Sequence, residues 1–597
     1  MEEINKRINE LRHLMYDNGI DVYIVCTDDY HNSEYVGDYF KEREFISGFT
    51  GSAGIAVITN DEALLWTDGR YFIQAEMELK DSEFKLMKIG VPGVKKISEY
   101  LCDTMLDGDT LGFDGRTVSV AFVKNIDEGL KGRKVNLVYD VDLIDYIWSD
   151  RPELSKKPVF ELDIKYAGVS REEKISKIRS EMEKTGADVL LITALDEIAW
   201  ILNLRGDDVL CNPVFLAYMI IEKDKVHLFI NESILNENIK EKLIETGVSI
   251  NRYNDFYSKI NEYKEKVIMY DPHKINFMTE RSIDENNKII IDKSPVERMK
   301  AIKNEIEYNN IIKAHIKDGV AVTKFMYWLK NNVGKIDITE ISAAEKLEEF
   351  RREQDNYLGP SFEPIVAYGA HGAIVHYSVN KKTDVVIENK GLLLSDTGGH
   401  YIEGTTDITR TFAFSDLTDE EKKSFTLVLA GHLNLANAKF KYGITGMNLD
   451  DLARGPLWRE GLDYNHGTGH GVGYLLNVHE GPNSIGWQSS ARRTTNTVFE
   501  EGMITSNEPG VYFEGKFGIR HENMILCLKD EENEYGQFMK FVNLTMVPFD
   551  LDGVDKKYLS DREVMWLNEY HKEVYEKISP YLNEDEREWL KRATRSI

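Results

Sequence analysis

Apolar residues recur at helical spacing twice in the first half of the chain, and a short apolar run follows each time. The first copy has Ile8, Leu11 and Met15, then Gly19, then the apolar run 22–25. The same order returns about 167 residues later, with Ile175, Ile178, Met182, Gly186 and the run 189–192. Such spacing indicates an amphipathic helix, a glycine C-cap and a buried strand. The pattern therefore predicts two related α/β domains.

Two stretches read as domain boundaries. A charged, proline-containing stretch covers 151–165, and a second boundary falls near 291–296. There Ser294, Pro295 and Glu297 suit the N-cap, first and third positions of a helix, and we expect this helix to run from Glu297 to about Lys330. The predicted domains are 1–158, 159–293 and 294–597.

The last third alternates long helical segments with strand-rich segments. This pattern is typical of an α+β domain in which helices accompany a curved antiparallel sheet. Beyond Val554 the helical periodicity returns, with aromatic residues at Trp566, Tyr570 and Trp589. We expect a helical extension there, and the fold class is α/β for the first two domains and α+β for the third.

Composition makes two classes of partner poor candidates. The chain has 597 residues, with 102 acidic against 74 basic side chains and a net charge of −28, which disfavours nucleic acid and anionic membranes. Residues 1–12 alternate charged and apolar positions, unlike a secretion signal, and no apolar run approaches 18 residues. Four widely spaced cysteines favour a reducing compartment. We therefore expect a cytoplasmic protein.

Candidate chemistry lies in five short motifs of the last third. They are Ser-Asp-Thr-Gly-Gly, Gly-Thr-Thr-Asp-Ile-Thr-Arg, His-Gly-Thr-Gly-His-Gly, Asn-Glu-Pro-Gly and Gly-Ile-Arg-His-Glu-Asn, which contain Asp396, Asp407, His470, Glu508 and Glu522. Taken singly, an aspartate beside Gly-Gly is usually a turn residue, and a lone histidine is usually solvated or hydrogen-bonded. The conjunction of all five, each flanked by glycine, favours a shared site.

Four carboxylates and one imidazole suit a pair of divalent cations. Two such ions about 3.5–4 Å apart repel each other, and bridging carboxylates neutralise and clamp them. Oxygen donors with one imidazole and no thiolate favour Mn²⁺, with Co²⁺, Fe²⁺ or Zn²⁺ as alternatives. A water or hydroxide between two such ions has a lowered pKa and becomes a nucleophile. The motifs therefore predict metal-assisted hydrolysis.

Spacing suggests part of the geometry. Asp396 and Asp407 are eleven residues apart, so a hairpin with an even loop would place them directly opposite, on one face. Glu508 and Glu522 are fourteen apart, so we expect a regular hairpin not to oppose them without a bulge, and the spacing leaves their geometry open. The glycines around His470 favour an irregular loop.

The same motifs resemble those of the pita-bread metallopeptidases, the family of methionine aminopeptidase, prolidase and aminopeptidase P. Further segments are similar to the long, three-domain aminopeptidase P. They are 47–54 (SGFTGSAG), 66–71 (WTDGRY), 145–148 (DYIW), 203–206 (NLRG), 372–377 (GAIVHY) and 566–571 (WLNEYH). The resemblance covers essentially the whole chain. It implies two creatinase-like N-terminal domains, a pita-bread catalytic domain, two divalent metals and a homodimer.

The resemblance also implies residue roles. Asp396 and Asp407 would hold the first metal, Asp407, His470 and Glu508 would contact the second, and Glu522 would bridge both. Glu508 is also the implied proton acceptor. His376, His466 and His479 match histidines that position the scissile carbonyl and stabilise developing charge, and Phe362 matches the wall of the proline pocket. His521 departs from the family pattern, where an aliphatic residue is usual, and we expect it to face away from the metals.

The activity implied is release of an N-terminal residue that precedes proline. Prolidase, which cleaves only Xaa-Pro dipeptides, is the nearest alternative, but the internal repeat, Trp148 and Trp566 favour aminopeptidase P. A non-catalytic peptide-binding module on the same fold would typically have lost metal ligands. Metal-free creatinase-like C–N hydrolysis is disfavoured for the same reason, since all five candidate ligands are present.

Overall fold

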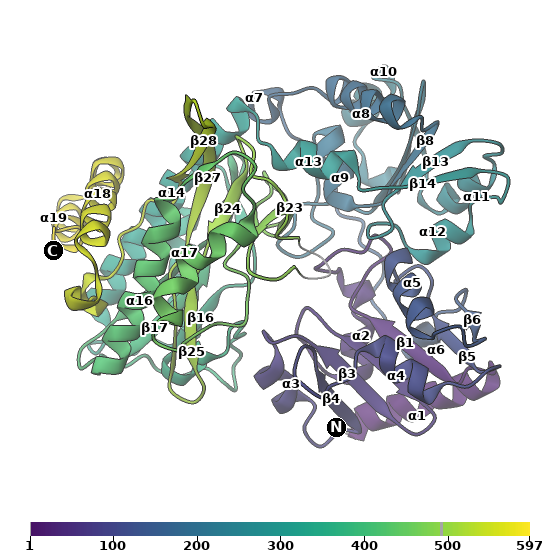
Figure 1. Ribbon diagram of the computed structural model, residues 1–597, viewed down its shortest axis with the longest axis horizontal. Coiled ribbons are helices and arrows are strands. Elements are labelled where there is room, and N and C mark those ends of the chain that lie inside the picture. The colour runs from purple at the N-terminus through teal and green to yellow at the C-terminus, as the bar shows by residue number, and fades with distance from the viewer. Residues whose placement is uncertain (1, 490–493) are drawn as a thin grey trace. The chain divides into compact units, whose positions relative to one another are not determined.

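The computed structural model describes residues 2–489 and 494–597, which form two compact units (Figure 1). The first unit comprises Met1–Leu162 and Val169–Val296, and the second comprises Asp163–Gly168 and Glu297–Ile597. Among the described residues, no helix is both long and apolar enough to cross a membrane.

The first unit contains two six-stranded sheets with the same topology. Their strand orders are β4-β3-β2-β1-β5-β6 and β12-β11-β10-β8-β13-β14. In each sheet the central strand, β1 or β8, pairs antiparallel with one neighbour and parallel with the other. The strands are β1 (Val22–Cys26), β2 (Ile55–Thr59), β3 (Ala63–Thr67), β4 (Phe84–Lys88), β5 (Thr110–Phe113), β6 (Asn136–Val138), β8 (Val189–Ile192), β10 (Ala217–Glu222), β11 (Val226–Ile230), β12 (Val248–Arg252), β13 (Val267–Tyr270) and β14 (Lys288–Ile291). A short pair, β7 (Phe160–Glu161) with β9 (Leu204–Arg205), completes the strands.

The helix before each central strand explains the sequence repeat. Helix α1 (Glu2–Asp17) buries Ile8, Leu11 and Met15, and α8 (Arg171–Thr185) buries the equivalent residues of the second copy. Gly186 ends α8 in the left-handed conformation, at φ 79°, which favours glycine. The repeat is therefore a real structural duplication. The other helices are α2 (Glu42–Ser47), α3 (Phe72–Glu78), α4 (Ile97–Thr104), α5 (Val120–Gly129), α6 (Leu143–Ile147), α9 (Leu195–Leu202), α10 (Glu237–Glu245), α11 (Phe256–Asn261) and α12 (Phe277–Arg281).

The second unit is built on antiparallel sheets. One six-stranded sheet has the order β21-β28-β27-β24-β22-β23, and smaller sheets have the orders β15-β18-β19, β16-β17-β20 and β25-β26. All pairs of these named strands are antiparallel. The strands are β15 (Tyr357–Pro360), β16 (Ile365–Tyr368), β17 (Leu392–Thr397), β18 (Gly399–Tyr401), β19 (Gly404–Thr405), β20 (Ile408–Ala413), β21 (Lys439–Lys441), β22 (Gly469–Gly471), β23 (Glu480–Ile485), β24 (Ile504–Asn507), β25 (Gly510–Phe513), β26 (Phe517–Arg520), β27 (Asn523–Asn533) and β28 (Gly536–Asn543).

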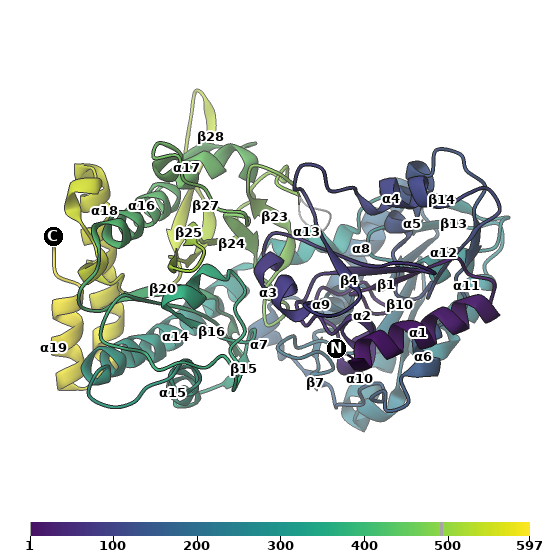
Figure 2. The same ribbon diagram turned by 90° about the horizontal axis from the view of Figure 1, so that it is seen from below.

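Helices accompany these sheets, as expected for an α+β unit (Figure 2). The helix expected from Glu297 to about Lys330 is in fact two helices, because Asn304 and Glu307 form a capping box that starts a new helix. The helices are α7 (Ile164–Ala167), α13 (Pro295–Ala301), α14 (Glu305–Asn332), α15 (Glu340–Arg352), α16 (Asp419–Ala436), α17 (Gly446–Trp458), α18 (Asp561–Ile578) and α19 (Glu584–Ala593). The last two form the predicted C-terminal helical extension and pack against α14.

Candidate metal centre

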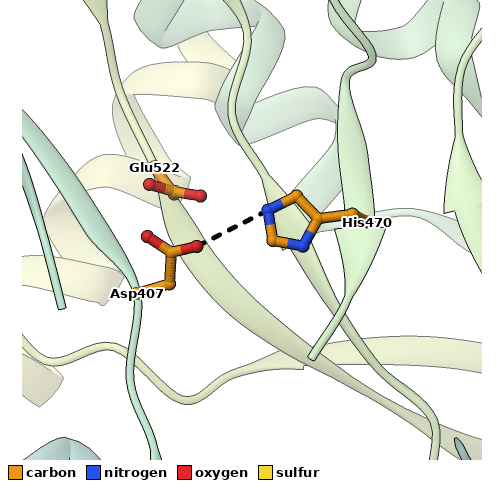
Figure 3. Close-up of side chains that lie close together, drawn as sticks. All are labelled: Asp407, His470 and Glu522. Atoms are coloured by element: carbon orange, nitrogen blue, oxygen red, sulfur yellow. Dashed lines mark ion pairs between the residues drawn. The ribbon is translucent and has the colours of Figure 1, made fainter. Parts of the chain in front are cut away.

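Three of the five predicted ligands converge in the second unit (Figure 3). Asp407 precedes β20, His470 lies in β22 and Glu522 precedes β27. Each offers one ligand atom, and these atoms all lie within 4.8 Å of one another. The three side chains are buried, and His470 Nε2 lies 3.5 Å from Asp407 Oδ2. This arrangement can hold a metal ion.

The other two predicted ligands border this group. Glu508 Oε1 lies 3.4 Å from His470 Nε2. Asp396, in β17, and Asp407 are close enough that the charge of Asp407 raises the pKa of Asp396. The structure therefore brings all five candidate residues together from five separate segments of the chain.

The hairpin geometry expected for the two aspartates is only partly right. In the pairing of β17 with β20, Asp396 lies opposite Thr409 rather than opposite Asp407. Asp407 stands two residues before Thr409, and residues two apart on an extended strand point to the same face. The two carboxylates therefore share a face diagonally. Direct opposition was wrong because the register is shifted by two residues.

The expectation that a regular hairpin would not oppose Glu508 and Glu522 was wrong. Asn507 pairs with Asn523 on one side of these residues, and Gly510 pairs with Arg520 on the other. Both pairs belong to one register, and it places Glu508 across from Glu522. An even separation is opposed because the turn between Phe513 and Phe517 contains three residues, and an odd loop pairs residues at even separations. No bulge is needed.

The glycines around His470 allow neighbouring strands to pack closely. They do not form the irregular loop that we expected. His470 lies in the short strand β22, which pairs with β23 and β24. A Cβ atom at Gly469 would lie 2.0 Å from the carbonyl oxygen of Ser506, and one at Gly471 would lie 2.3 Å from that of Glu480. Only glycine therefore lets the neighbouring backbones flank the imidazole on both sides.

Burial makes the carboxylate cluster unfavourable without a compensating cation. It raises the pKa of Glu508 to about 7, and it raises the pKa values of Asp396 and Glu522. Neighbouring carboxylates raise them further. Asp396 Oδ1 is buried and has no hydrogen-bond partner. A buried, unpartnered carboxylate oxygen within such a cluster fits divalent cations, because they would neutralise the carboxylates and coordinate that oxygen.

The structure adds two residues that the sequence analysis did not assign to the site. Arg520 Nη2 donates to Asp396 Oδ2 at 2.6 Å, and Nη1 donates to the Tyr512 hydroxyl at 2.6 Å. That hydroxyl lies 2.8 Å from His466 Nε2. One signal was available: Arg520 stands two residues before Glu522, so the two side chains share a strand face.

The remaining predicted residues lie on segments that border the cluster. The His479 ring contacts the His470 ring edge to face, with centroids 4.3 Å apart. His376 follows Val375, whose carbonyl oxygen accepts a hydrogen bond from Arg520 Nη2 at 3.4 Å. The half-buried Phe362 packs so close to Gly398, two residues after Asp396, that a Cβ atom there would lie 2.9 Å from its ring.

His521 faces away from the cluster, as expected. Its buried ring packs edge to face against Phe425, with centroids 4.3 Å apart, and lies 5.6 Å from the Phe549 ring. Strand alternation explains this, because successive side chains point to opposite faces and Glu522 takes the metal-facing side.

A second carboxylate cluster, in the first unit, is an ion-pair network. Glu42, Asp114 and Asp142 lie close enough to hold a metal. However, Arg151 pairs with Glu42 and with Asp142, and Arg116 Nη2 lies 2.8 Å from Asp114 Oδ2. These guanidinium groups already supply the compensating positive charge.

Four segments along the chain match known family descriptions. They are Creatinase/Prolidase N-terminal domain at 7–144 and at 150–307, Metallopeptidase family M24 at 309–529, and C-terminal region of peptidase_M24 at 537–597. The internal duplication thus corresponds to two creatinase-type domains, and the candidate metal centre lies in the M24 segment.

Similarity to curated proteins extends over nearly the full chain. A probable Xaa-Pro aminopeptidase P of Laccaria bicolor is 40% identical over 98% of this chain and 92% of its own. Xaa-Pro aminopeptidase 1 of Dictyostelium discoideum is 40% identical over 98% of this chain and 96% of its own.

A solved structure agrees. The X-prolyl aminopeptidase of Caenorhabditis elegans, described as a cytosolic enzyme with a di-nuclear active site, has a TM-score of 0.95 and 34% identity. The match covers 100% of both chains. Duplicated creatinase-type domains, an M24 domain of the pita-bread fold and full-length similarity all agree, and the chain therefore belongs to the aminopeptidase P family of M24 metallopeptidases.

Proposed function

We propose that this chain is a metal-dependent Xaa-Pro aminopeptidase, which hydrolyses the bond between an N-terminal residue and a following proline. The observation that carries the proposal is the buried cluster of Asp396, Asp407, His470, Glu508 and Glu522. Full-length similarity to Xaa-Pro aminopeptidases supports the choice of reaction.

The cluster suits two divalent ions, and the C. elegans relative is described as di-nuclear. Asp396 and Asp407 would hold one ion, Asp407, His470 and Glu508 would contact the other, and Glu522 would bridge them. Asp396 Oδ1, which has no protein partner, fits this assignment. Oxygen donors with a single imidazole favour Mn²⁺, while Co²⁺, Zn²⁺ and Fe²⁺ have compatible ligand preferences.

The protein groups around the cluster would orient the substrate and move protons. When bound, the two ions would supply a water of lowered pKa as the nucleophile. Glu508 is the proton acceptor that the family resemblance implies, and its Oε1 lies 3.4 Å from His470 Nε2 within the cluster. His376, His466 and His479 would position the scissile carbonyl and stabilise its developing negative charge. Tyr512 orients His466 through a 2.8 Å hydrogen bond.

Selectivity for proline would come from shape. The pyrrolidine ring is rigid, and the nitrogen of proline carries no hydrogen in a peptide bond, so a pocket fitted to it gains contacts that other residues cannot match. Phe362 would form one wall of that pocket. Its half-buried position beside Gly398 places an aromatic surface near Asp396.

Three further features belong to this proposal. The domain boundaries would be 1–158, 159–293 and 294–597, which follow the duplication and the helix start at Pro295. The protein would act in the cytoplasm, as the C. elegans relative is described as cytosolic. It would form a homodimer, an expectation that rests on family resemblance. Light scattering on the purified protein tests this directly.

The test is amino-acid release from three peptides: Arg-Pro-Pro, the dipeptide Arg-Pro, and Arg-Ala-Ala as the specificity control. Each is assayed with protein as purified, after EDTA, and after Mn²⁺ is restored. We expect arginine release from Arg-Pro-Pro, loss of release with EDTA, recovery with Mn²⁺, and little release from Arg-Ala-Ala.

The alternatives give different outcomes in the same assay. Cleavage of Arg-Pro alone would identify a prolidase. Failure of Mn²⁺-loaded protein to cleave any of the three peptides would favour the non-catalytic peptide-binding module. Activity that survives complete metal removal would overturn the two-metal assignment.

A further inference from the structure

Arg410 is a buried cation on the far side of the candidate metal centre. It lies on β20 beside Thr409, whose hydroxyl donates to Glu522 Oε2 at 2.9 Å. Successive side chains on a strand point to opposite faces, so the Arg410 side chain points away from the metal centre. Its side chain is 1% exposed. Among the described residues Arg410 forms no ion pair, and its charge is compensated by hydrogen bonds and by the ring of Phe549.

The guanidinium of Arg410 holds the backbone around Glu522. Nη1 donates to the carbonyl oxygen of Glu522 at 2.6 Å, and Nη2 donates to Asn523 Oδ1 at 2.7 Å. Glu522 N donates in turn to the carbonyl oxygen of Thr409 at 3.0 Å. These bonds fix the position of the Glu522 backbone and so orient its carboxylate toward the cluster.

Helix α18 holds Arg410 in place through Tyr570, which lies 160 residues further along the chain. Arg410 Nη2 donates to the Tyr570 hydroxyl at 3.1 Å, and that hydroxyl donates to the carbonyl oxygen of Val547 at 2.8 Å. The next residue, His571, accepts a hydrogen bond at Nε2 from the backbone of Phe549 at 3.0 Å. The Phe549 ring lies 4.1 Å from the Arg410 guanidinium carbon, within cation–π distance.

Packing does not enclose Tyr570 completely. A cavity of about 160 Å³ borders its ring and is also lined by His432, Asn523, Phe549 and Glu573. A side chain that borders a cavity lacks packing contacts on that side. The hydroxyl contacts therefore help to fix the ring. Together with the hydrogen bonds from Arg410 to the carbonyl oxygens of Val547 and Pro548, they hold the guanidinium.

We propose that Tyr570 and His571 are positioning residues for the metal centre: α18 fixes Arg410, and Arg410 fixes the backbone that presents Glu522. The C-terminal extension would thus set metal affinity without placing a side chain in the carboxylate cluster. This inference rests on the ligand assignment proposed above for Glu522. It extends that assignment to a helix with no predicted ligand.

The test compares Tyr570→Phe with Tyr575→Phe on metal-stripped, full-length protein. Tyr575 lies on the same helix and is half-buried, so its variant controls for the loss of a hydroxyl from α18. Calorimetric titration with Mn²⁺ gives the dissociation constant. Loss of a group that orients a metal ligand typically weakens metal binding by about 10–100-fold. We therefore expect about 10-fold weaker Mn²⁺ binding for Tyr570→Phe and less than about twofold change for Tyr575→Phe.

Arg410→Lys is the second variant, because lysine keeps the charge but cannot form the fork of bonds. We expect weaker Mn²⁺ binding than in Tyr570→Phe, by up to about 100-fold relative to wild type. A Tyr570→Phe protein that unfolds at lower temperature yet binds Mn²⁺ like wild type would mean a purely structural role and overturn this inference. Failure of the wild type to bind Mn²⁺ would overturn the ligand assignment, and this inference with it.

Discussion

Arg520 and Asp396 form a buried ion pair in which only one carboxylate oxygen is used. Arg520 Nη2 lies 2.6 Å from Asp396 Oδ2, while Oδ1 has no protein partner. The guanidinium therefore fixes the carboxylate plane and leaves the second oxygen for a cation. Its charge also lowers the pKa of Asp396, against the larger effect of burial, which raises it.

This pair predicts that Tyr512→Phe and Arg520→Lys differ in what they lose. Tyr512→Phe removes the hydroxyl between Arg520 and His466 but leaves the ion pair. We expect metal content to stay at the wild-type level and turnover to fall by about 10–100-fold, as for other groups that orient site residues. Arg520→Lys cannot hold both partners with the same geometry, so metal content and turnover should both fall. Metal analysis and kcat measurements on the same samples test this, and metal loss in Tyr512→Phe would contradict it.

The ligand assignment predicts that Asp407→Asn abolishes metal binding and activity together. Asp407, like Glu522, is assigned to both ions, and an amide at position 407 removes one negative charge from the cluster. His376→Ala is the matched comparison, because it should retain the metal while turnover falls. Metal stoichiometry measured beside peptide cleavage separates the two cases. Retained activity in Asp407→Asn would contradict the two-metal assignment.

Local patterns predicted the domain repeat and the residues of the cluster. The helix, glycine and strand order around Ile8 and Ile175 depends only on nearest neighbours along the chain, so it is readable from sequence. The five ligand motifs were recognisable because each contains glycine together with a carboxylate or imidazole side chain. Both features could be predicted because each depends on residues that are close together in the sequence.

Properties set by distant partners were harder to predict. The opposition of Glu508 and Glu522 depends on a three-residue turn, and nothing in the local spacing distinguished it from an even loop. The break before α14 was missed because the Asn304 cap lies inside a continuous helical pattern. The roles of Arg410 and Tyr570 depend on hydrogen bonds that span 160 positions of sequence.

A buried ion pair beside His479 predicts a large loss of stability. Glu480 lies between Lys303, which it contacts at Oε1, and Lys300, whose Nζ is 2.9 Å from Oε2. All three side chains are nearly inaccessible. Glu480→Gln removes this carboxylate from two buried ammonium groups, and we expect a loss of about 3–5 kcal/mol.

Denaturant unfolding of Glu480→Gln measures this effect. Glu501→Gln is the surface control, because Glu501 pairs with Lys529 at 3.4 Å and both side chains are exposed. Exposed pairs contribute about 0–1 kcal/mol, so the control should stay close to wild type. Equal losses in the two variants would show that burial of the Glu480 pair has no special effect.

Burial of Glu508 predicts that stabilisation by metal grows with pH. Folding raises its pKa from 4.5 to about 7, so in the metal-free protein protonated Glu508 favours the folded state at low pH. That contribution is fully present below pH 4.5 and is lost as pH rises through about 7; it amounts to about 3 kcal/mol. The raised pKa values of Asp396 and Glu522 act in the same direction.

Mn²⁺ binding requires the deprotonated carboxylates and therefore becomes tighter as pH rises. Unfolding temperatures with EDTA and with Mn²⁺, measured between about pH 5 and about pH 8, should diverge as pH rises. Taking the difference between the two forms matters, because buried histidines such as His432 and His571 have lowered pKa values and favour folding at higher pH. Their effect is common to both forms and cancels. A Mn²⁺-induced shift that stays constant across this range would contradict proton-coupled binding at Glu508.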